Sequence, residues 1–212
     1  MRKFTIEANN FLSQNIQGYH HQYYIGGEER HKAPNNIEHL ICSFKNDITI
    51  TPDEEMERCI DWLSDILHED LCVVAEKENL SNPTICVIPR AKVNYRPDQL
   101  FFKATVKRVV EELPSVQDGT NYIVRTTDTR TTHRNRSGNG GTGKLPYPGI
   151  TKDTCYISNC VIGKDVILID DLYTKSVNID EDAIEALLQK GAKSVTFYSI
   201  GRTVSRYELL TL

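Results

Sequence analysis

Hydrophobic residues recur with helical spacing in the segment that begins at Thr51, and they define one buried helical face. Thr51 and Glu54 have the spacing of a capping box, and Pro52 suits the first helical position. The pattern therefore predicts a helix that starts at Thr51. The apolar positions of its buried face are Met56, Cys59, Ile60, Leu63, Ile66 and Leu67.

Two further segments, residues 98–113 and 179–192, have the same helical period, and Gly191 is expected to end the second helix. Short apolar runs between the helices predict buried strands. Strands that alternate with helices indicate right-handed crossovers and a mainly parallel sheet with helices on both faces. We therefore expect a single α/β domain over residues 1–212. The predicted strands are Thr84–Ile88, Asn121–Arg125, Val166–Asp170 and Ser194–Ile200.

Two segments do not follow these patterns. Residues 1–50 mix aromatic and polar side chains, and we expect strands or irregular structure that covers the sheet as an N-terminal hood. Residues 126–154 are rich in Thr, Arg, Gly and Asn, which cannot form a core. Loops longer than about 12–15 residues in compact domains are commonly functional, so this segment is expected to be a mobile lid.

Composition is that of a globular protein, with 39% hydrophobic and 25% charged residues. No apolar run approaches the roughly 20 residues of a membrane-spanning helix, and the first residues do not resemble a secretory leader. A soluble, cytoplasmic protein without a membrane partner is expected. The net charge of -4 gives no general attraction to nucleic acid. The six cysteines contain no C-x-x-C pair, and the six histidines lack metal-binding spacing, so structural roles are expected for both.

The strongest candidate site follows the strand VILID. Ligands of parallel sheets bind beyond the carboxyl ends of the strands, where Asp170 and Asp171 are expected to lie. The segment LYTKSVN then leads into a helix, whose free N–H groups and dipole suit a phosphate. Carboxylates can accept hydrogen bonds from ribose hydroxyls while the turn holds a 5′-phosphate. The sequence therefore predicts a sugar-phosphate site.

Four apolar residues, two acids and a Thr-containing turn into a helix resemble the binding motif of type I phosphoribosyltransferases. The segments HLICSFKN, CVIPRAKVNYRPDQLFFKATVKRVV and IVRTTDTRTTHRNRSGNG precede it in the order seen in ComF-like, amidophosphoribosyltransferase-related proteins. The resemblance covers about Glu38 to Arg202. It implies a type I phosphoribosyltransferase-like fold and transfer of a phosphoribosyl group from phosphoribosyl pyrophosphate to an amine or nitrogen heterocycle. It also implies Mg²⁺ and is compatible with a homodimer.

The resemblance further assigns roles to individual residues. Asp170 and Asp171 would hold the ribose and its magnesium, directly or through the ribose hydroxyls, and act as catalytic residues. Arg130 and Arg134 would act from the lid, which also contains Arg136, with Arg125 at its root. The residues expected to bind the 5′-phosphate are Thr174, Lys175, Ser176, Val177 and Asn178, and those expected to bind pyrophosphate are Pro89, Arg90 and Lys92.

The turn departs from the family pattern, which usually reads Thr-Thr-Gly-x-Thr. Ser176 adds a Cβ where the family has glycine, and a positive φ there would be costly. The three acids at residues 180–182 would repel a phosphate, whereas Lys175 adds a cation. These departures support an alternative function, in which a non-catalytic protein senses a phosphoribosyl compound or nucleotide within a regulatory complex.

Other function classes fit the sequence less well. The run TRTTHRNR could contact nucleic acid, but the chain has no broader basic face. The string GNGGTGKL nearly matches a P-loop, yet Leu145 replaces the magnesium-binding hydroxyl, and Pro146 and Pro148 prevent the helix that should follow. The absence of a G-x-S-x-G motif argues against an α/β-hydrolase.

Overall fold

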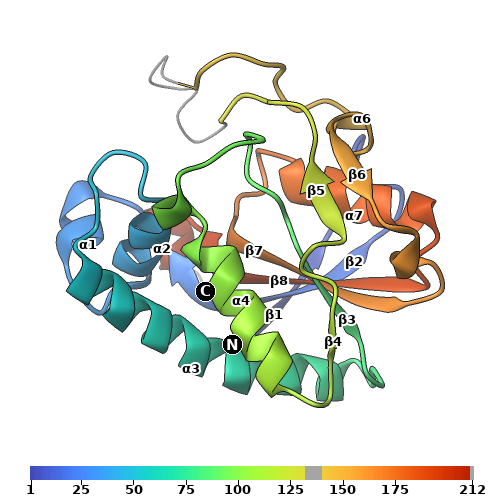
Figure 1. Cartoon of the computed structure of the whole chain (residues 1–212), viewed down its shortest axis with the longest axis horizontal. Coiled ribbons are helices and arrows are strands. Elements are labelled where there is room, and N and C mark those ends of the chain that lie inside the picture. Colours follow the sequence, from blue (N-terminus) through green and yellow to red (C-terminus); the bar gives the residue numbers. More distant parts are fainter. Residues whose placement is uncertain (132–139, 211–212) are drawn as a thin grey trace.

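The computed structural model describes residues 1–131 and 140–210, and its central feature is a six-stranded sheet (Figure 1). The strand order is β1-β2-β8-β7-β3-β4, in which only the edge strand β1 is antiparallel to its neighbour. The prediction of an α/β protein with a mainly parallel sheet is confirmed. The strands of this sheet are β1 (Arg2–Ile6), β2 (Ile16–Tyr24), β3 (Thr84–Val87), β4 (Gln117–Asp118), β7 (Asp165–Tyr173) and β8 (Ser194–Thr203).

Helices cover both faces of the sheet, as the alternation of elements predicted. Alternate residues of β7 enter two separate cores, Ile167 and Ile169 the first, Val166 and Leu168 the second. The first core is covered by α2 (Ile37–Lys45), α3 (Asp53–Lys77) and α4 (Phe101–Glu112), and the second by α7 (Ile179–Lys190) (Figure 1). The short helical elements are α1 (Glu28–Lys32), η1 (Pro97–Gln99), α6 (Ile150–Thr154), η2 (Asn159–Val161) and α8 (Arg206–Leu209).

The order of connections creates a crevice between β3 and β7. From β3 the chain passes through α4 to β4, toward one edge of the sheet. From β7 it passes through α7 to β8, toward the opposite edge. The two neighbouring strands therefore send their connections in opposite directions. In open α/β sheets, ligands bind at this switch point, beyond the carboxyl ends of the two strands.

The long helix has the predicted buried face but a different start. α3 begins at Asp53, and no side chain caps it. The Thr51 hydroxyl donates instead to the Ser43 carbonyl, and the Thr51 N–H to the Asn46 side chain, so the predicted capping box with Glu54 does not form. Tertiary contacts with the end of α2 thus replace a local cap.

The N-terminal segment, for which we expected strands or irregular cover, forms two strands of the sheet followed by the helices α1 and α2. β2 pairs in parallel with β8, for example Tyr19 with Tyr198, and Tyr19 is fully buried. β1 then pairs with β2 and forms the edge. Tyr19 is therefore a core residue, and Tyr23 and Tyr24 are half-buried, in a strand whose partner β8 lies near the other end of the sequence.

The predicted strand at 121–125 is present but outside the main sheet. β5 (Ile123–Arg125) pairs with β6 (Cys155–Ile157) in a separate antiparallel pair (Figure 1). The prediction that this strand belongs to the parallel sheet is therefore wrong. The expected lid lies between these strands; its residues 132–139, with Arg134 and Arg136, lie outside the described residues. Within its described part, residues 150–154 form α6, which we had not predicted.

No helix among the described residues is long and apolar enough to cross a membrane.

Candidate functional site

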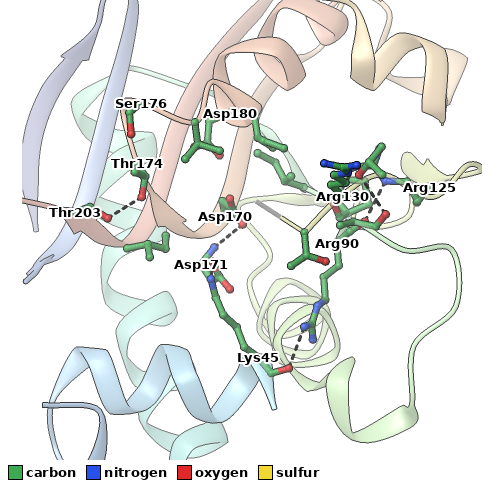
Figure 2. Close-up of a pocket in the computed structure, with 18 of the residues that line it drawn as sticks. Lys45, Arg90, Arg125, Arg130, Asp170, Asp171, Thr174, Ser176, Asp180 and Thr203 are labelled. Carbon is green, nitrogen blue, oxygen red and sulfur yellow. Dashed lines mark hydrogen bonds and ion pairs between the residues drawn. The ribbon is translucent and has the colours of Figure 1, made fainter. Parts of the chain in front are cut away.

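A pocket of about 390 Å³ lies at the switch point. Its walls come from the residues after β3, from the carboxyl end of β7 with the turn into α7, and from the segment after β5. Figure 2 shows Thr174 and Ser176 on one side of the pocket, Arg125 and Arg130 on the other, and Asp170 between them. A volume of 300–1,000 Å³ is typical of small-molecule sites. The predicted site residues that line it are Pro89, Arg90, Arg130, Asp170, Asp171, Thr174, Ser176 and Val177.

The two predicted acids lie in the pocket, although they do not end their strand. β7 continues through Leu172 to Tyr173, which both pair with β8. Asp170 and Asp171 therefore lie within the strand, just before its end. The Asp171 N–H donates to the Asp170 carboxylate over 2.7 Å. The acids are therefore held by regular strand structure, which fixes their position better than a loop would.

Asp170 also shares a hydrogen bond with Asp180, from the first turn of α7. Burial and the nearby charge of Asp171 raise the pKa of Asp170 to about 7. Burial and the charge of Asp170 raise the pKa of Asp180 well above its ordinary value. Two adjacent carboxyl groups cannot both ionise cheaply in a buried place, so this pair holds one proton near neutral pH, with Asp180 as the donor.

Lys45, the last residue of α2, adds a cation to the acids. Its ammonium nitrogen lies 3.3 Å from a carboxylate oxygen of Asp171, and both side chains are about four-fifths buried (Figure 2). Burial alone would lower the pKa of Lys45, but the charges of Asp171 and Asp170 outweigh it and raise this pKa. Lys45 therefore stays charged and offsets part of the negative charge of the pocket.

The turn after β7 offers backbone donors to the pocket. The N–H groups of Ser176 and Ile179, two residues that line the pocket, donate to no acceptor among the described residues. The Thr174 hydroxyl is held 2.7 Å from the hydroxyl of Thr203, at the end of β8. Free N–H groups at a helix start, beside hydroxyls, form a concavity suited to a phosphate.

The expected strain at Ser176 does not arise. The left-handed residue of this turn is Asn178, with φ 59°, and Ser176 has no positive φ. Asparagine tolerates this conformation better than most residues do. The turn therefore reaches α7 without the glycine of the family pattern.

Lys175 does not line the pocket, so its predicted role in phosphate binding is not supported by the geometry. Its ammonium group lies 2.8 Å from Glu7, on the exposed surface. Asn178 also points elsewhere, since its side-chain oxygen accepts from Asn9. The cation expected to compensate for the altered turn thus comes from Lys45, a residue to which the sequence analysis gave no role.

Of the three acids at the start of α7, Asp180 lines the pocket, whereas Glu181 and Asp182 do not crowd the phosphate position as expected. Asp182 accepts from the N–H groups of Gly149 and Thr151 and thereby caps α6. Glu181 accepts from the buried hydroxyl of Tyr173 at 2.9 Å. Two of the three acids thus serve to fasten neighbouring segments around the turn.

The cations expected to bind pyrophosphate make internal contacts. Arg90 lines the pocket, but its guanidinium donates to Asp47 at 2.7 Å and to the Lys45 carbonyl at 3.0 Å. Lys92 does not line the pocket and donates to the carbonyls of Thr129 and Thr142. The contacts of Lys92 join the segment after β3 to Thr129 and Thr142, and those of Arg90 join it to the end of α2.

Two arginines complete the wall on this side. Arg125 is 8% exposed and donates to the carbonyls of Pro89 and Arg90 and to the Thr154 hydroxyl. Arg130 lines the pocket, is exposed, and its guanidinium has no partner among the described residues. Arg130 is therefore the lining cation best placed to meet a ligand anion. The other predicted catalytic arginine, Arg134, lies outside the described residues.

The structure also adds residues that sequence reasoning missed. Lys45, Tyr95, Asp180 and Thr203 all line the pocket. Asp180 was noted only as an unfavourable charge, although its place in the first turn of a helix beside a phosphate turn could have marked it as a pocket residue. Lys45, Tyr95 and Thr203 come from distant segments and carry no local signal.

Carboxylate oxygens are the ligands that Mg²⁺ prefers, so the donor set of Asp170 and Asp171 fits this ion. A divalent cation there would compete with Lys45 for Asp171 and with the proton shared by Asp170 and Asp180. The chemistry of the pocket is therefore compatible with Mg²⁺ brought in by a phosphorylated ligand.

No protein-family model matches the chain, and no curated protein is significantly similar to it in sequence.

Proposed function

We propose that this domain is of the type I phosphoribosyltransferase kind and transfers a phosphoribosyl group from phosphoribosyl pyrophosphate to an amine or nitrogen heterocycle. The observation that carries the proposal is the continuity of the acids and the phosphate turn. Asp170 and Asp171 in β7 are followed at once by a turn with free N–H groups, and both line one pocket at the switch point of the sheet. This arrangement matches a ribose and its 5′-phosphate.

In the proposed complex, the N–H groups of Ser176 and Ile179 and the Thr174 hydroxyl donate to the 5′-phosphate. Asp171 and Asp170 accept hydrogen bonds from the ribose hydroxyls. As the bond to pyrophosphate breaks, positive charge develops on the ribose and negative charge on the leaving group. The carboxylates stabilise the positive charge, Arg130 on the opposite wall stabilises the negative charge, and Lys45 offsets part of the charge of Asp171 beside it.

Mg²⁺, if bound with the substrate at Asp170 and Asp171, would supply further neutralisation of the leaving pyrophosphate. The protein itself positions the sugar phosphate and holds the two acids at a fixed distance from the phosphate turn.

Calorimetric titration with phosphoribosyl pyrophosphate and Mg²⁺ tests the binding step. The double variant Asp170→Asn, Asp171→Asn is expected to abolish binding without loss of the fold. A matched control is Asp61→Asn with Asp65→Asn, which changes the net charge equally on the exposed side of α3. Wild-type affinity in the first variant would sink the proposal.

A non-catalytic sensor remains the second candidate, and one observation favours it. The two cations expected to neutralise pyrophosphate, Arg90 and Lys92, are both bound to protein groups. Such a pocket could hold a phosphoribosyl compound without promoting loss of pyrophosphate. Pyrophosphate release in the presence of mixed amine and heterocyclic acceptors separates the two functions, since binding without release indicates the sensor.

A further inference from the structure

A second cluster of reactive side chains lies between α2 and α3, apart from the pocket. His39, Glu55 and Cys59 each bring one ligating atom within 4.8 Å of the other two. No other such group of His, Cys, Asp or Glu occurs among the described residues. We propose that these three side chains form a zinc site that joins α2 to α3.

The helices position the three ligands in register. Glu55 and Cys59 are four residues apart in α3, and this spacing places them on the same face of the helix. His39 faces them from α2, which packs against α3 in the same hydrophobic core. Three ligands from two rigid helices keep their separation without a loop that must first become ordered.

The hydrogen bonds of His39 match those of a metal-binding imidazole. Its Nδ1 lies 2.8 Å from the carbonyl oxygen of His31, which can only accept, so Nδ1 carries a proton. Its Nε2 lies 2.8 Å from a Glu55 oxygen. Metal-binding histidines commonly donate one N–H to a carbonyl while the other nitrogen faces the metal. Nε2 and the Glu55 oxygen face each other, and a zinc ion between them would be bound by both.

The ligand set and its burial favour zinc over other common ions. One thiolate, one imidazole and one carboxylate suit Zn²⁺, and they do not suit Mg²⁺ or Ca²⁺, which prefer oxygen ligands alone. Cys59 is 2% exposed, whereas the side chains of His39 and Glu55 are 18% and 21% exposed. The site is therefore open on one side, where zinc can enter and a water can occupy the fourth position.

Zinc binding requires only a small rearrangement. Tetrahedral zinc has bonds of about 2.0–2.3 Å, so its ligating atoms lie roughly 3.3–3.8 Å apart. The Nε2 to Oε1 distance of 2.8 Å must widen slightly, and the Cys59 sulfur, which lies within 4.8 Å of both atoms, must reach a distance in this range. Side-chain rotation on fixed helices can supply these adjustments. The other Glu55 oxygen is held by Arg58 at 2.5 Å, which already orients the carboxylate.

Cobalt substitution tests the site in the full-length protein after removal of metals with a chelator. We expect one equivalent of Co²⁺ to give the intense visible bands of tetrahedral coordination and a thiolate charge-transfer band, and one equivalent of Zn²⁺ to displace it. Cys59→Ser should remove the charge-transfer band, and His39→Gln should weaken Zn²⁺ binding by at least about tenfold. Cys72→Ser, at an exposed position of the same helix, is the matched control and should bind as the wild type does.

Thermal unfolding provides a readout that is independent of the spectrum. Zn²⁺ should raise the Tm of the wild type and of Cys72→Ser, but not that of Cys59→Ser or His39→Gln. Circular dichroism shows whether each variant is folded, and Glu55→Gln, at a partly exposed position, provides a third ligand variant. Absence of stoichiometric binding in the wild type, or binding that survives loss of both Cys59 and His39, would overturn the site.

Discussion

The ammonium group of Lys45 lies 3.3 Å from the carboxylate of Asp171, and this contact joins the end of α2 to β7 inside the pocket. The pocket thus contains a buried cation directly beside its paired acids. A phosphorylated ligand that binds there would meet a positive charge already held in place, so less side-chain entropy is lost on binding than with a free surface lysine.

The first prediction concerns this cation. Lys45→Met keeps the length of the side chain but removes its charge, and the affinity for phosphoribosyl pyrophosphate is expected to fall about tenfold or more, because charge-assisted hydrogen bonds contribute roughly 1.5–3 kcal/mol. Calorimetric titration measures the change. Lys175→Met is the matched control, since Lys175 pairs with Glu7 outside the pocket and its loss should leave the affinity unchanged. Equal losses in both variants would mean that only the net charge matters.

The second prediction concerns the proton of Asp180. Because the pKa of Asp180 is raised in the folded protein, the folded state binds more protons than the unfolded state above the ordinary pKa of 3.8, and stability falls as the pH rises from there. Asp180→Asn keeps a hydrogen-bond donor for Asp170 without this linkage. The variant should therefore gain stability over the wild type with rising pH, by up to about 1.4 kcal/mol per pH unit.

Urea unfolding at pH 5, 6, 7 and 8 measures the effect of Asp180→Asn. Asp61→Asn on the exposed side of α3 should change the free energy of unfolding by a similar small amount at each pH. A constant difference between Asp180→Asn and the wild type across this range would show that Asp180 is ionised in the folded protein.

The sequence predicts the part of the site whose residues lie close together along the chain. The strand with its two acids, the turn and α7 follow one another directly, so periodicity and a helix-end pattern identified them. Lys45 and Thr203 were not found, because they reach the pocket only through the packing of α2 and the extension of β8. The sequence also could not show that the Lys175 side chain points away from the pocket, because this orientation depends on its contact with Glu7 in the N-terminal segment.

The missed elements of the fold have the same cause. β5 has the apolar pattern of a sheet strand, but its partner is β6, so its place depends on pairing across the long segment between them. α6 is only five residues long and has no strong helical period. It is stabilised by Asp182 from another helix, and no local pattern could indicate that contact.

The third prediction concerns His20, which is completely buried in β2 against Phe4 and Tyr23. Burial lowers its pKa from 6.5 to about 4. The folded state therefore binds fewer protons than the unfolded state below pH 6.5, and stability is lost as the pH falls from about 6.5 toward 4. His20→Leu should remove this loss, which amounts to about 3 kcal/mol at most.

Replacement by glutamine separates two effects of His20 on stability, the loss at acid pH and the cost of burying ring nitrogens without hydrogen-bond partners. Neither ring nitrogen has a hydrogen-bond partner in the described structure, and a buried polar group without a partner costs about 1–3 kcal/mol. His20→Leu should therefore also be more stable than the wild type at pH 7.5, whereas His20→Gln should lose the acid-side dependence without that gain. Urea unfolding between pH 4.5 and 7.5 measures both, and an unchanged pH dependence in His20→Leu would contradict the assignment.

The last prediction concerns the attachment of α6 by Asp182, which is 2% exposed and receives the N–H groups of Gly149 and Thr151 on separate oxygens. Asp182→Ala leaves both donors without an acceptor, so the free energy of unfolding should fall by about 2 kcal/mol or more. Asp182→Asn keeps one acceptor oxygen and should lose less. Because Thr154 at the end of α6 accepts from Arg125, the amide protons of residues 150–154 should exchange faster in Asp182→Ala, and sugar-phosphate affinity should fall as the Arg125 wall of the pocket loosens. If Asp182→Ala is as stable as the wild type and exchange in α6 is unchanged, the helix is held by its apolar contacts alone and the cap has no role in shaping the pocket.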